Sequence, residues 1–425
     1  MNTPVNSFPV DAQPERLARI ARRMQRTGQW SPSQAAGRRW TIGCVSLEIT
    51  QRCNLDCTLC YLSENSERMR DLPIEVLLRR IDRIRDTYGP GVGVQVTGGD
   101  PTLRAREELV RIVRRISERE LRPSLLTNGI RATRPLLEEL ARAGLFDIAF
   151  HVDTTQRRKG YASEADLNAV RQEYIERARG LKLAVIFNTT VHGGNLEEIP
   201  SLARFFLQRS DVVGMASFQV QATTGRGEWR ERSFEVTPDA VAERIAKGTG
   251  LSRLAWDTAL VGHPKCNRGA MLATVGDQAV DVLTDRALYE RFLEEFRHVP
   301  FDRRNVPRTV RQVLAASLSD PSWFLPATRF LFRKLWEARR GLCRLERIGK
   351  ITFFIHNFMD GAALDPERIR NCSFMVMTEE GPVSMCEVNS RRDDFILPRV
   401  PLPSHPGGKA FFDPRSGRVE GAPAG

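Results

Sequence analysis

The feature that most constrains the fold of this 425-residue chain is a regular alternation of strand-like and helix-like segments between residues 44 and 220. Runs rich in β-branched and aromatic residues predict six strands, at 44–50, 92–97, 123–128, 146–152, 183–191 and 215–220. Segments with helical periodicity lie between them, at 74–87, 104–119, 133–143, 163–179 and 196–208. Alternating strands and helices form parallel sheets, so the pattern predicts an α/β fold with a partial (β/α)6 barrel of the TIM type.

The composition is that of an ordinary globular protein. Charged residues make up 27% and hydrophobic residues 41%, which argues against a disordered chain. No apolar run reaches the roughly 18 residues that a membrane-spanning helix needs, and the polar first residues lack the apolar core of a signal peptide. We therefore expect a cytoplasmic protein.

The formal net charge of +12 comes from 64 basic and 52 acidic residues, and only 7 of the basic residues are lysines. Most arginines alternate with acids along predicted helices, as at 79–86, which is typical of a solvated helix face. No zinc-finger, RRM or homeodomain pattern accompanies them, so we expect no nucleic-acid partner. An acidic redox protein and an anionic membrane surface fit the charge equally well.

Cysteine spacing is the strongest chemical signal. Cys53, Cys57 and Cys60, three of the eight cysteines, form a C-x3-C-x2-C pattern soon after the first predicted strand. Structural zinc sites normally need four ligands in paired units, and no histidine lies nearby. Three thiolates in one loop suit a [4Fe–4S] cluster whose fourth iron has no protein ligand and can bind a small molecule.

Polar turns follow the next three strands at the same end of the predicted barrel. They are Thr-Gly-Gly-Asp at 97–100, Thr-Asn-Gly at 127–129 and His-Val-Asp at 151–153. Chemistry in parallel α/β folds is found beyond the carboxyl ends of the strands, where the cysteine pattern also lies, so we expect one active site there. For several polar residues in these turns, cap or turn chemistry and a ligand contact are equal alternatives.

Together, the cysteine pattern, the Gly-Gly-acid turn and the Thr-Asn-Gly turn resemble the radical SAM superfamily over residues 42–240. The resemblance implies that the three cysteines hold a [4Fe–4S] cluster that binds S-adenosylmethionine and reductively cleaves it to a 5′-deoxyadenosyl radical. It implies S-adenosylmethionine contacts by Gly98, Gly99, Asp100, Thr127, Asn128, Asn188 and Tyr61. In the family the glycines let the backbone approach the methionine moiety, and the acid pairs with its ammonium group. His151 and Asp153 are the expected catalytic residues, and a flavodoxin or ferredoxin is the implied electron donor.

A narrower resemblance covers the segments 150–161, 163–176, 262–272, 353–372 and 382–389. They are similar to a subgroup that contains the class D radical SAM C-methylases and the archaeal tetraether lipid synthases. This resemblance implies C–C bond formation at an unactivated sp3 carbon, by methylation or alkyl-chain coupling, on a hydrophobic or lipid-like substrate. It also implies an auxiliary [4Fe–4S] cluster in the C-terminal region.

The C-terminal cysteines are compatible with an auxiliary cluster without deciding its ligands. Cys372 and Cys386 flank a predicted hairpin, which brings its ends together, and Cys266 lies in a His-Pro-x-Cys loop. Cys343 is a candidate fourth ligand, although its leucine neighbours also suit a buried thiol. Cys44, within the first strand, is more simply a small core residue.

Four regions follow from these patterns: a basic helical N-terminal extension (1–41), the barrel (42–240), a helical substrate and auxiliary-cluster region (241–400) and a flexible tail (401–425). Within the third region, residues 323–342 combine Trp, Phe and Leu with Arg and Lys. Core packing with a basic outer face is the usual explanation of such a stretch. An amphipathic helix that contacts the inner face of the membrane is the alternative.

Three hypotheses for function follow. The first is a radical SAM enzyme that forms a C–C bond. The second is a radical SAM maturase that modifies peptides, although only four cysteines lie past the barrel and no N-terminal winged helix is evident. The third is a non-enzymatic iron–sulfur redox protein, which the open iron disfavours. His263 and His356 are further ligand or substrate-contact candidates, although a lone histidine is more often structural.

Overall fold

The computed structural model describes residues 44–229, 235–256, 258, 262–296, 306–319, 321–402 and 410–421. The predicted N-terminal extension, 1–41, and its expected helix lie outside these residues. Among the described helices, none is both long enough and apolar enough to cross a lipid bilayer.

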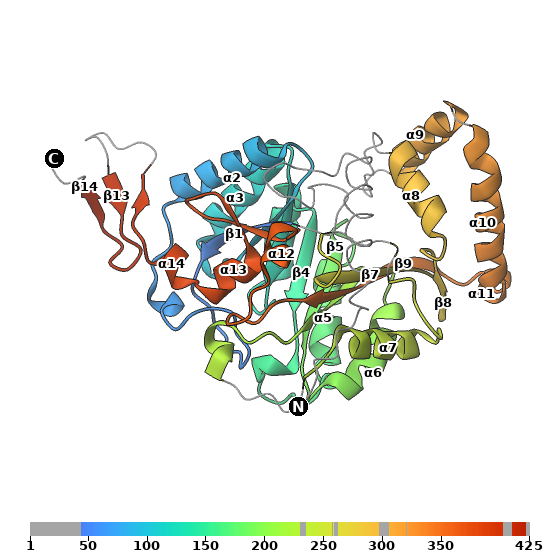
Figure 1. Cartoon of the computed structure of the whole chain (residues 1–425), viewed down its shortest axis with the longest axis horizontal. Coiled ribbons are helices and arrows are strands. Elements are labelled where there is room, and N and C mark those ends of the chain that lie inside the picture. The colour runs from blue at the N-terminus through green and yellow to red at the C-terminus, as the bar shows by residue number, and fades with distance from the viewer. Residues whose placement is uncertain are drawn as a thin grey trace.

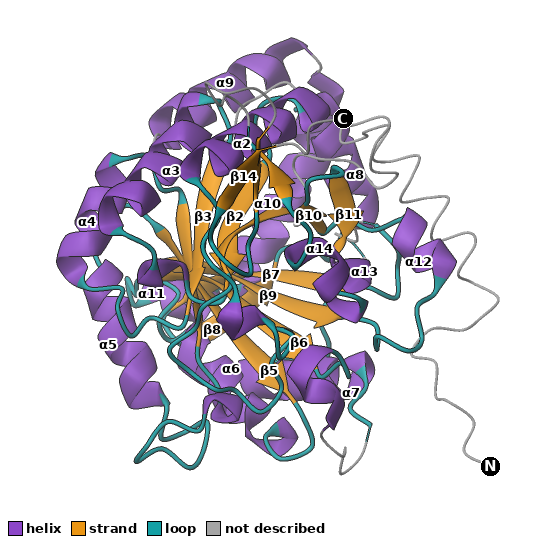
Figure 2. Ribbon diagram, turned by 90° about the vertical axis from the view of Figure 1, so that its left-hand side faces the viewer, coloured by secondary structure: helices purple, strands orange, loops and turns teal. Residues whose placement is uncertain are grey.

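All six predicted strands are present and pair in parallel in chain order. Their bounds are β1 Val45–Thr50, β2 Gly93–Gly98, β3 Arg122–Thr127, β4 Asp147–His151, β5 Ala184–Val191 and β6 Val213–Val220. Figure 2 shows the strands at the centre with helices around them. Leu47, Val94 and Phe187 are completely buried, as expected where helices cover the outer face of a parallel sheet. The predicted partial barrel is confirmed.

The helices between these strands are α2 Ile74–Tyr88, α3 Arg106–Glu118, α4 Arg134–Arg142, α5 Asn168–Ala178 and α6 Ile199–Leu207. In α2, Leu77, Ile81 and Ile84 recur at helical spacing and are completely buried, because this face packs on the sheet. The helix ends at Gly89, whose φ of 77° favours glycine. The largest delay is at α5, which begins five residues later than predicted because Asp166 Oδ2 accepts two backbone hydrogen bonds that form a turn there.

C-terminal strands extend the same sheet at both edges. β9 (Ile348–Asn357) pairs in parallel with β6 and antiparallel with β7 (Asn267–Val275), which pairs with β8 (Gln278–Asp281). At the other edge, β10 (Met375–Met377) pairs in parallel with β1, and β11 (Pro382–Ser384) completes the predicted hairpin. Within the described residues, the predicted regions 42–240 and 241–400 therefore share one eleven-stranded sheet.

Helices within the predicted region 241–400 form an arm at the right of Figure 1. Its helices are α8 (Arg286–Glu295), α9 (Val306–Ser319), α10 (Phe324–Glu337) and α11 (Arg339–Cys343). Phe292 of α8 and Phe296, the residue after the helix, pack against Trp323, just before α10, with ring centroids 5.9 and 5.3 Å from that of Trp323. At the base of the arm, Ala338 is buried against β7 and β8.

The remaining helices are α7 (Pro238–Thr249), α12 (Pro366–Arg370), α13 (Met385–Ser390) and α14 (Asp393–Ile396). Short 3-10 helices are η2 Ser66–Arg68, η3 Pro101–Leu103, η4 Thr154–Gln156, η5 Leu196–Glu198, η6 Gly225–Trp229 and η8 Pro321–Trp323. Where a flexible tail was predicted, β12 (Val400–Pro401), β13 (Ala410–Phe412) and β14 (Val419–Gly421) pair into a small antiparallel sheet. Burial of Ala410 and Phe412 accounts for this order.

Candidate active site

The cysteine loop (residues 51–65) leaves β1 at the carboxyl end of the barrel strands. Burial raises the pKa of the Cys57 thiol, and the Asp153 carboxylate and then the two neighbouring motif cysteines raise it further. Burial also raises the pKa of Cys53, with a contribution from Cys60. The pKa of each of these two thiols therefore responds to a neighbouring motif cysteine, and joint binding of a cluster by Cys53, Cys57 and Cys60 stays a prediction.

Two nitrogen donors point at sulfurs of this loop. Arg226 Nη2, from the segment after β6, lies 3.2 Å from Cys60 Sγ. Asn128 Nδ2, from the turn after β3, lies 3.9 Å from Cys53 Sγ and donates to Asn54 Oδ1 at 2.6 Å. Hydrogen bonds and positive charge near a thiolate tune iron–sulfur sites. Sequence reasoning did not find Arg226, because nothing local links it to a cysteine 166 positions away.

Gly98 and Gly99 allow two backbones to approach each other closely. A β-carbon at Gly98 would lie 1.9 Å from the Thr50 carbonyl oxygen, and one at Gly99 would lie 2.0 Å from that of Arg52. The backbone N–H groups of Gly99 and Asp100 donate to the same two carbonyls, at 2.9 and 2.8 Å. The turn after β2 therefore holds the start of the cysteine loop, a role that the sequence did not predict. The expected contact of these glycines with S-adenosylmethionine stays a prediction.

Asp100 is a buried junction between the turns that follow β2 and β3. Its carboxylate accepts hydrogen bonds from Thr102 N and Oγ1, from Thr127 Oγ1 and from Asn128 N. Only 1% of the residue is exposed. Because these donors already surround the carboxylate, Asp100 orients Thr127 and Asn128, and its direct pairing with an ammonium group stays a prediction.

His151 and Asp153 form a pair at the end of β4. His151 Nε2 lies 2.6 Å from Asp153 Oδ2, which also accepts a hydrogen bond from Thr190 N at 2.7 Å. Burial acts to lower the pKa of His151, but the Asp153 carboxylate outweighs it and the net shift is upward. Burial alone would raise the pKa of Asp153, whereas His151 and its hydrogen-bond donors hold it well below the usual range. His151 and Asn188 line the cavity of the barrel, and Asp153 lies behind them.

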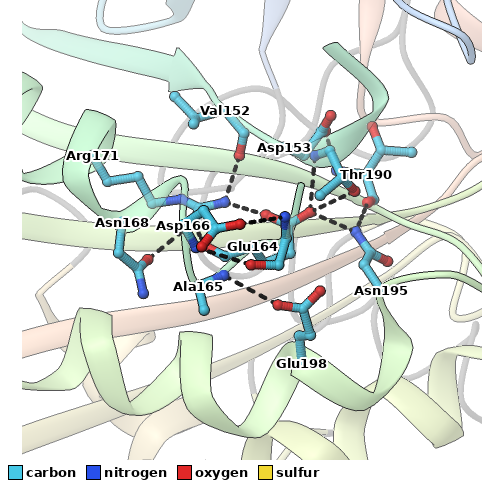
Figure 3. A network of polar contacts seen from close by, with 12 residues as sticks. Val152, Asp153, Glu164, Ala165, Asp166, Asn168, Arg171, Thr190, Asn195 and Glu198 are labelled. Atoms are coloured by element: carbon cyan, nitrogen blue, oxygen red, sulfur yellow. Dashed lines mark hydrogen bonds and ion pairs between the residues drawn. The ribbon is translucent and has the colours of Figure 1, made fainter. Parts of the chain in front are cut away.

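Next to Asp153, a buried network fixes the segment between β4 and α5 (Figure 3). Arg171 of α5 pairs with Glu164, and both side chains are completely buried. Glu164 Oε1 accepts from Thr154 N and Oγ1, both at 3.0 Å, and from Asn195 Nδ2 at 2.8 Å. Sequence reasoning did not find this network, because its members belong to three separate segments. It rigidifies the loop that positions the predicted catalytic pair.

The C-terminal region reaches the cysteine loop through Arg392. Its Nη1 donates to both carboxylate oxygens of Glu48 at 2.8 Å, and its Nε donates to the Tyr61 carbonyl at 3.2 Å. The guanidinium lies 4.7 Å from the centre of the Tyr61 ring. The Tyr61 hydroxyl donates to the Gly98 carbonyl at 2.5 Å, and burial raises its pKa, so it stays protonated. Tyr61 is thus fixed beside the cavity by a partner that no local pattern could reveal.

A cavity of about 580 Å³ fills the barrel next to the cysteine loop. Tyr61 and His151 line it at the carboxyl end of the strands. Strands β1, β2 and β3 supply the polar side chains Ser46, Gln95 and Ser124. Strands β5, β6 and β7 supply the apolar side chains Ile186, Met215 and Met271. A cavity of this size holds one ligand of moderate size, and its mixed wall suits a molecule with polar and apolar parts.

Residues 47–206 match the family model described as the Radical SAM superfamily. The match spans the cysteine loop, the turns after β2, β3 and β4, and the strands that carry them. The chain carries a radical SAM domain.

Relatives of the radical SAM domain have different names and reactions. This chain is 29% identical over 188 residues to 7,8-dihydro-6-hydroxymethylpterin dimethyltransferase of Methanocaldococcus jannaschii, and the match covers 43% of this chain and 37% of that relative. It is 30% identical over 159 residues to PqqA peptide cyclase of Methylobacterium nodulans, covering 36% of this chain and 41% of that relative. The crystal structure of Streptococcus suis SuiB bound to S-adenosylmethionine matches at 15% identity and a TM-score of 0.37, over 45% of this chain and 44% of that chain. The matches span less than half the length of each of these proteins.

The donor set of the radical SAM domain fits a [4Fe–4S] cluster. In the part of the chain that the structure describes, no three His, Cys, Asp or Glu side chains are arranged to hold a single metal ion. A cube binds each thiolate at a separate iron, so its ligands stand farther apart than those of one ion. Three soft sulfur ligands in one loop, with N–H donors directed at two of them, are a donor set that suits such a cube.

Outside the radical SAM domain match, Cys266, Cys372 and Cys386 form a second set, the distal cysteine group. Burial, followed by the effects of Cys372 and Cys266, raises the pKa of Cys386 to about 12. Arg368 Nε lies 3.3 Å from Cys266 Sγ, and the same guanidinium donates to the Asn357 carbonyl. The predicted hairpin of β10 and β11 brings the segments that carry Cys372 and Cys386 side by side.

Cys343 does not join the distal cysteine group, which corrects its prediction as a fourth ligand. It is exposed at the end of α11, where its neighbour Leu342 packs on Val275. Val275 is the last residue of β7, whereas Cys266 precedes the first. The nine residues of β7 separate the two ends by about 30 Å.

The remaining candidates lie beside the cavity or the distal cysteine group. Cys44 lines the cavity, and burial raises its pKa to about 12. His356 also lines the cavity, and burial lowers its pKa to about 3, so it is neutral. His263 is completely buried, with Nε2 3.5 Å from Glu367 Oε2, three residues before the end of α12. Its position favours a structural role beside the distal group.

Proposed function

We propose that this protein is a radical SAM enzyme that reductively cleaves S-adenosylmethionine and uses the 5′-deoxyadenosyl radical to functionalise an unactivated sp3 carbon. The observation that carries the proposal is the cysteine loop beside the barrel cavity, bordered by the turns after β2 and β3. When bound to Cys53, Cys57 and Cys60, a [4Fe–4S] cluster supplies one electron and an open iron for S-adenosylmethionine.

The chain's own residues have distinct tasks in this proposal. Gly98 and Gly99 hold the cysteine loop against β2, and Asp100 orients the turn that contains Asn128. His151, whose pKa the Asp153 carboxylate raises, offers a proton or a hydrogen bond to a substrate in the cavity. The surrounding strands keep bulk water away from a reactive radical.

We propose that the reaction forms a C–C bond, by methylation or alkyl-chain coupling, on a lipid-like molecule that also carries a polar group. Similarity to a dimethyltransferase supports methyl transfer. The apolar lining residues Ile186, Met215 and Met271 support an alkyl part, and polar lining residues such as Gln95 and Ser217 disfavour a pure hydrocarbon.

An auxiliary [4Fe–4S] cluster on Cys266, Cys372 and Cys386 is part of this proposal. Support comes from the proximity of the three sulfurs and from the cationic Arg368 beside them. The electron donor is a flavodoxin or ferredoxin, whose acidic surface suits the net charge of +12. The proposed location is the cytoplasm, at the inner face of the membrane.

Anaerobic reconstitution followed by a strong reductant tests the proposal. The protein should release 5′-deoxyadenosine from S-adenosylmethionine, measured by mass spectrometry, and bind about eight irons if both clusters form. Clusters without cleavage would instead support a non-enzymatic iron–sulfur redox protein. Comparing lipid and metabolite extracts of deletion and parent strains then identifies the product, because methylation adds a methylene group and coupling removes two hydrogens.

Similarity to a PqqA peptide cyclase supports a second candidate, a maturase that modifies a peptide. The two candidates differ in what accelerates cleavage of S-adenosylmethionine. A lipid extract should do so for the first candidate, and a peptide fraction from the same cells should do so for the second.

A further inference from the structure

The helical arm carries most of the exposed apolar side chains. Of the thirteen large apolar side chains that are exposed among the described residues, ten lie between Val310 and Ile348. Leu325, Phe332 and Trp336 are 68%, 71% and 68% exposed. Spacings of seven and four residues return to the same side of a helix, so these three side chains form one apolar face of α10.

The same stretch concentrates positive charge. Residues 306–348 contain nine basic and three acidic residues, which is half of the chain's net charge of +12. Arg329 and Arg333 are exposed beside the apolar face, and the Arg339 guanidinium lies 4.4 Å from the centre of the Trp336 ring. A tryptophan and arginines at the edge of an apolar helical face are typical of a helix that lies among anionic lipid headgroups.

The barrel cavity opens at the end nearest the arm. At the amino ends of the strands it is lined by Gly91, by Arg122 and Lys350 with one acid, Asp147, and, from α8, by Tyr289. Arg122 and Lys350 are exposed, so we call this opening the amino-end mouth. The six residues of β1 span about 20 Å, and the cavity runs this length from the mouth to the cysteine loop.

Helix α8 connects the mouth to the apolar face. Tyr289 lies on the same helix as Phe292, which packs with the next residue after the helix, Phe296, against Trp323 just before α10. Arg291 Nη2 donates to Ser322 Oγ at 2.5 Å and strengthens this junction. A surface that carries α10 therefore lies beside the mouth.

We propose that the apolar face of α10 docks on an anionic lipid bilayer and that a membrane lipid enters the barrel through the amino-end mouth, opposite the cysteine loop. Arg122 and Lys350 bind its anionic headgroup at the mouth, and its alkyl chain extends along the cavity. This inference rests on the proposed function only for the reaction itself, which takes place at the end of the cavity beside the cysteine loop. Docking and entry need no S-adenosylmethionine.

Docking is tested by co-sedimentation with vesicles of phosphatidylcholine, alone or mixed with phosphatidylglycerol. The protein should bind the mixed vesicles at least about ten-fold more tightly, and the double variant F332E/W336E should lose about ten-fold of that affinity. The matched control Y161E/V419E adds the same charge at exposed apolar sites elsewhere and should bind like the parent. Equal binding to both vesicle types, no binding, or equal loss in the two double variants would overturn docking.

Entry is tested with a dansyl fatty acid, whose fluorescence reports binding in the cavity. The double variant R122E/K350E should bind it about ten-fold more weakly than the parent. R111E/R114E, which makes the same charge change on the exposed side of α3, should bind normally. Equal affinities of the two variants would refute entry at this mouth. Parent protein that cleaves S-adenosylmethionine but binds neither vesicle nor probe would remove this inference and leave the proposed function standing. Parent protein that binds vesicles and probe but does not cleave S-adenosylmethionine would remove the proposed function and leave docking and entry standing.

Discussion

The cysteine loop and the distal cysteine group present three thiols each but are built in opposite ways. The first set comes from one continuous loop after β1. The second comes from three separate segments: before β7, before β10 and within α13. In each set, an arginine from a distant segment lies within 3.3 Å of one sulfur, Arg226 in the first and Arg368 in the second.

This difference shows where each set obtains its geometry. The cysteine loop needs little more than its own sequence and the Gly98–Gly99 turn that holds its start. The distal group exists only because β9 pairs with β6 and β7, and β10 pairs with β1. The first set is therefore visible as a spacing, and the second appears only when the sheet is complete.

The largest expected effect comes from removing a thiol of the cysteine loop. Replacing Cys57 with Ala should abolish release of 5′-deoxyadenosine and remove about half of the bound iron, because the first cube loses a ligand. Iron analysis and mass spectrometry measure both. Cys44→Ala, which removes a half-buried thiol outside both sets, is the control and should retain both properties. Release at the parent rate by the Cys57 variant would disprove the cluster assignment.

Removing a thiol of the distal cysteine group should affect fewer steps of the reaction. Replacing Cys372 with Ala should also remove about half of the iron and stop product formation, but it should preserve cleavage of S-adenosylmethionine. The measurement combines iron analysis, 5′-deoxyadenosine release and product detection. Continued product formation would show that the distal group has no role in the reaction.

The His151–Asp153 pair predicts a pH-dependent effect beside the cysteine loop. The upward pKa shift of His151 stabilises the fold below about pH 6.5 and is lost as pH rises through its folded pKa. The downward shift of Asp153 stabilises it above about pH 4 and is lost on acidification. Asp153→Asn should therefore cost about 1–3 kcal/mol of unfolding free energy near pH 5.5 and less near pH 8.5.

Denaturant titrations at the two pH values measure this stability difference, and histidine NMR measures the pKa of His151, which should fall in the variant. His356→Asn, which alters a neutral histidine in the same cavity, is the control and should show little pH dependence. An Asp153 variant with the same stability loss at both pH values would contradict the charged pair.

Substitutions of Arg226 and Arg368 should have smaller effects, each on the reduction potential of one cluster. Arg226→Gln should lower the reduction potential of the first cluster by on the order of 50 mV, because removing a cation disfavours the more negative reduced state. Arg226→Lys should shift it less. Potentiometric EPR should show Arg368→Gln shifting only the second signal. If both substitutions shift the same signal, the assignment of one arginine to each set is wrong.

The smallest expected effect concerns Cys343. Cys343→Ser should leave iron content, cleavage and product formation unchanged, because this thiol is exposed about 30 Å from Cys266 along β7. Loss of iron in this variant would show that the distal group draws a ligand from the arm.

Much of the barrel was predictable because its signals are local. Side-chain periodicity placed β1 at 44–50 against an observed Val45–Thr50, and α2 at 74–87 against Ile74–Tyr88. The hairpin of β10 and β11 was predictable from the short polar turn between two apolar runs. The sequence did not predict that β7, β8 and β9 extend the same sheet, because strand pairing across long separations leaves no local pattern.

What the sequence determined by itself is the order of strands and helices, the cysteine loop and the polar turns at one end of the barrel. Each of these depends on residues close together in the chain, where dihedral preference and periodicity act. Tertiary structure alone decided the partners of these residues: Arg226 at Cys60, Arg392 at Glu48, and Cys266 beside Cys372. It also exposed the apolar face of α10, because a helix presents a face to solvent or to a core only after its neighbours have packed.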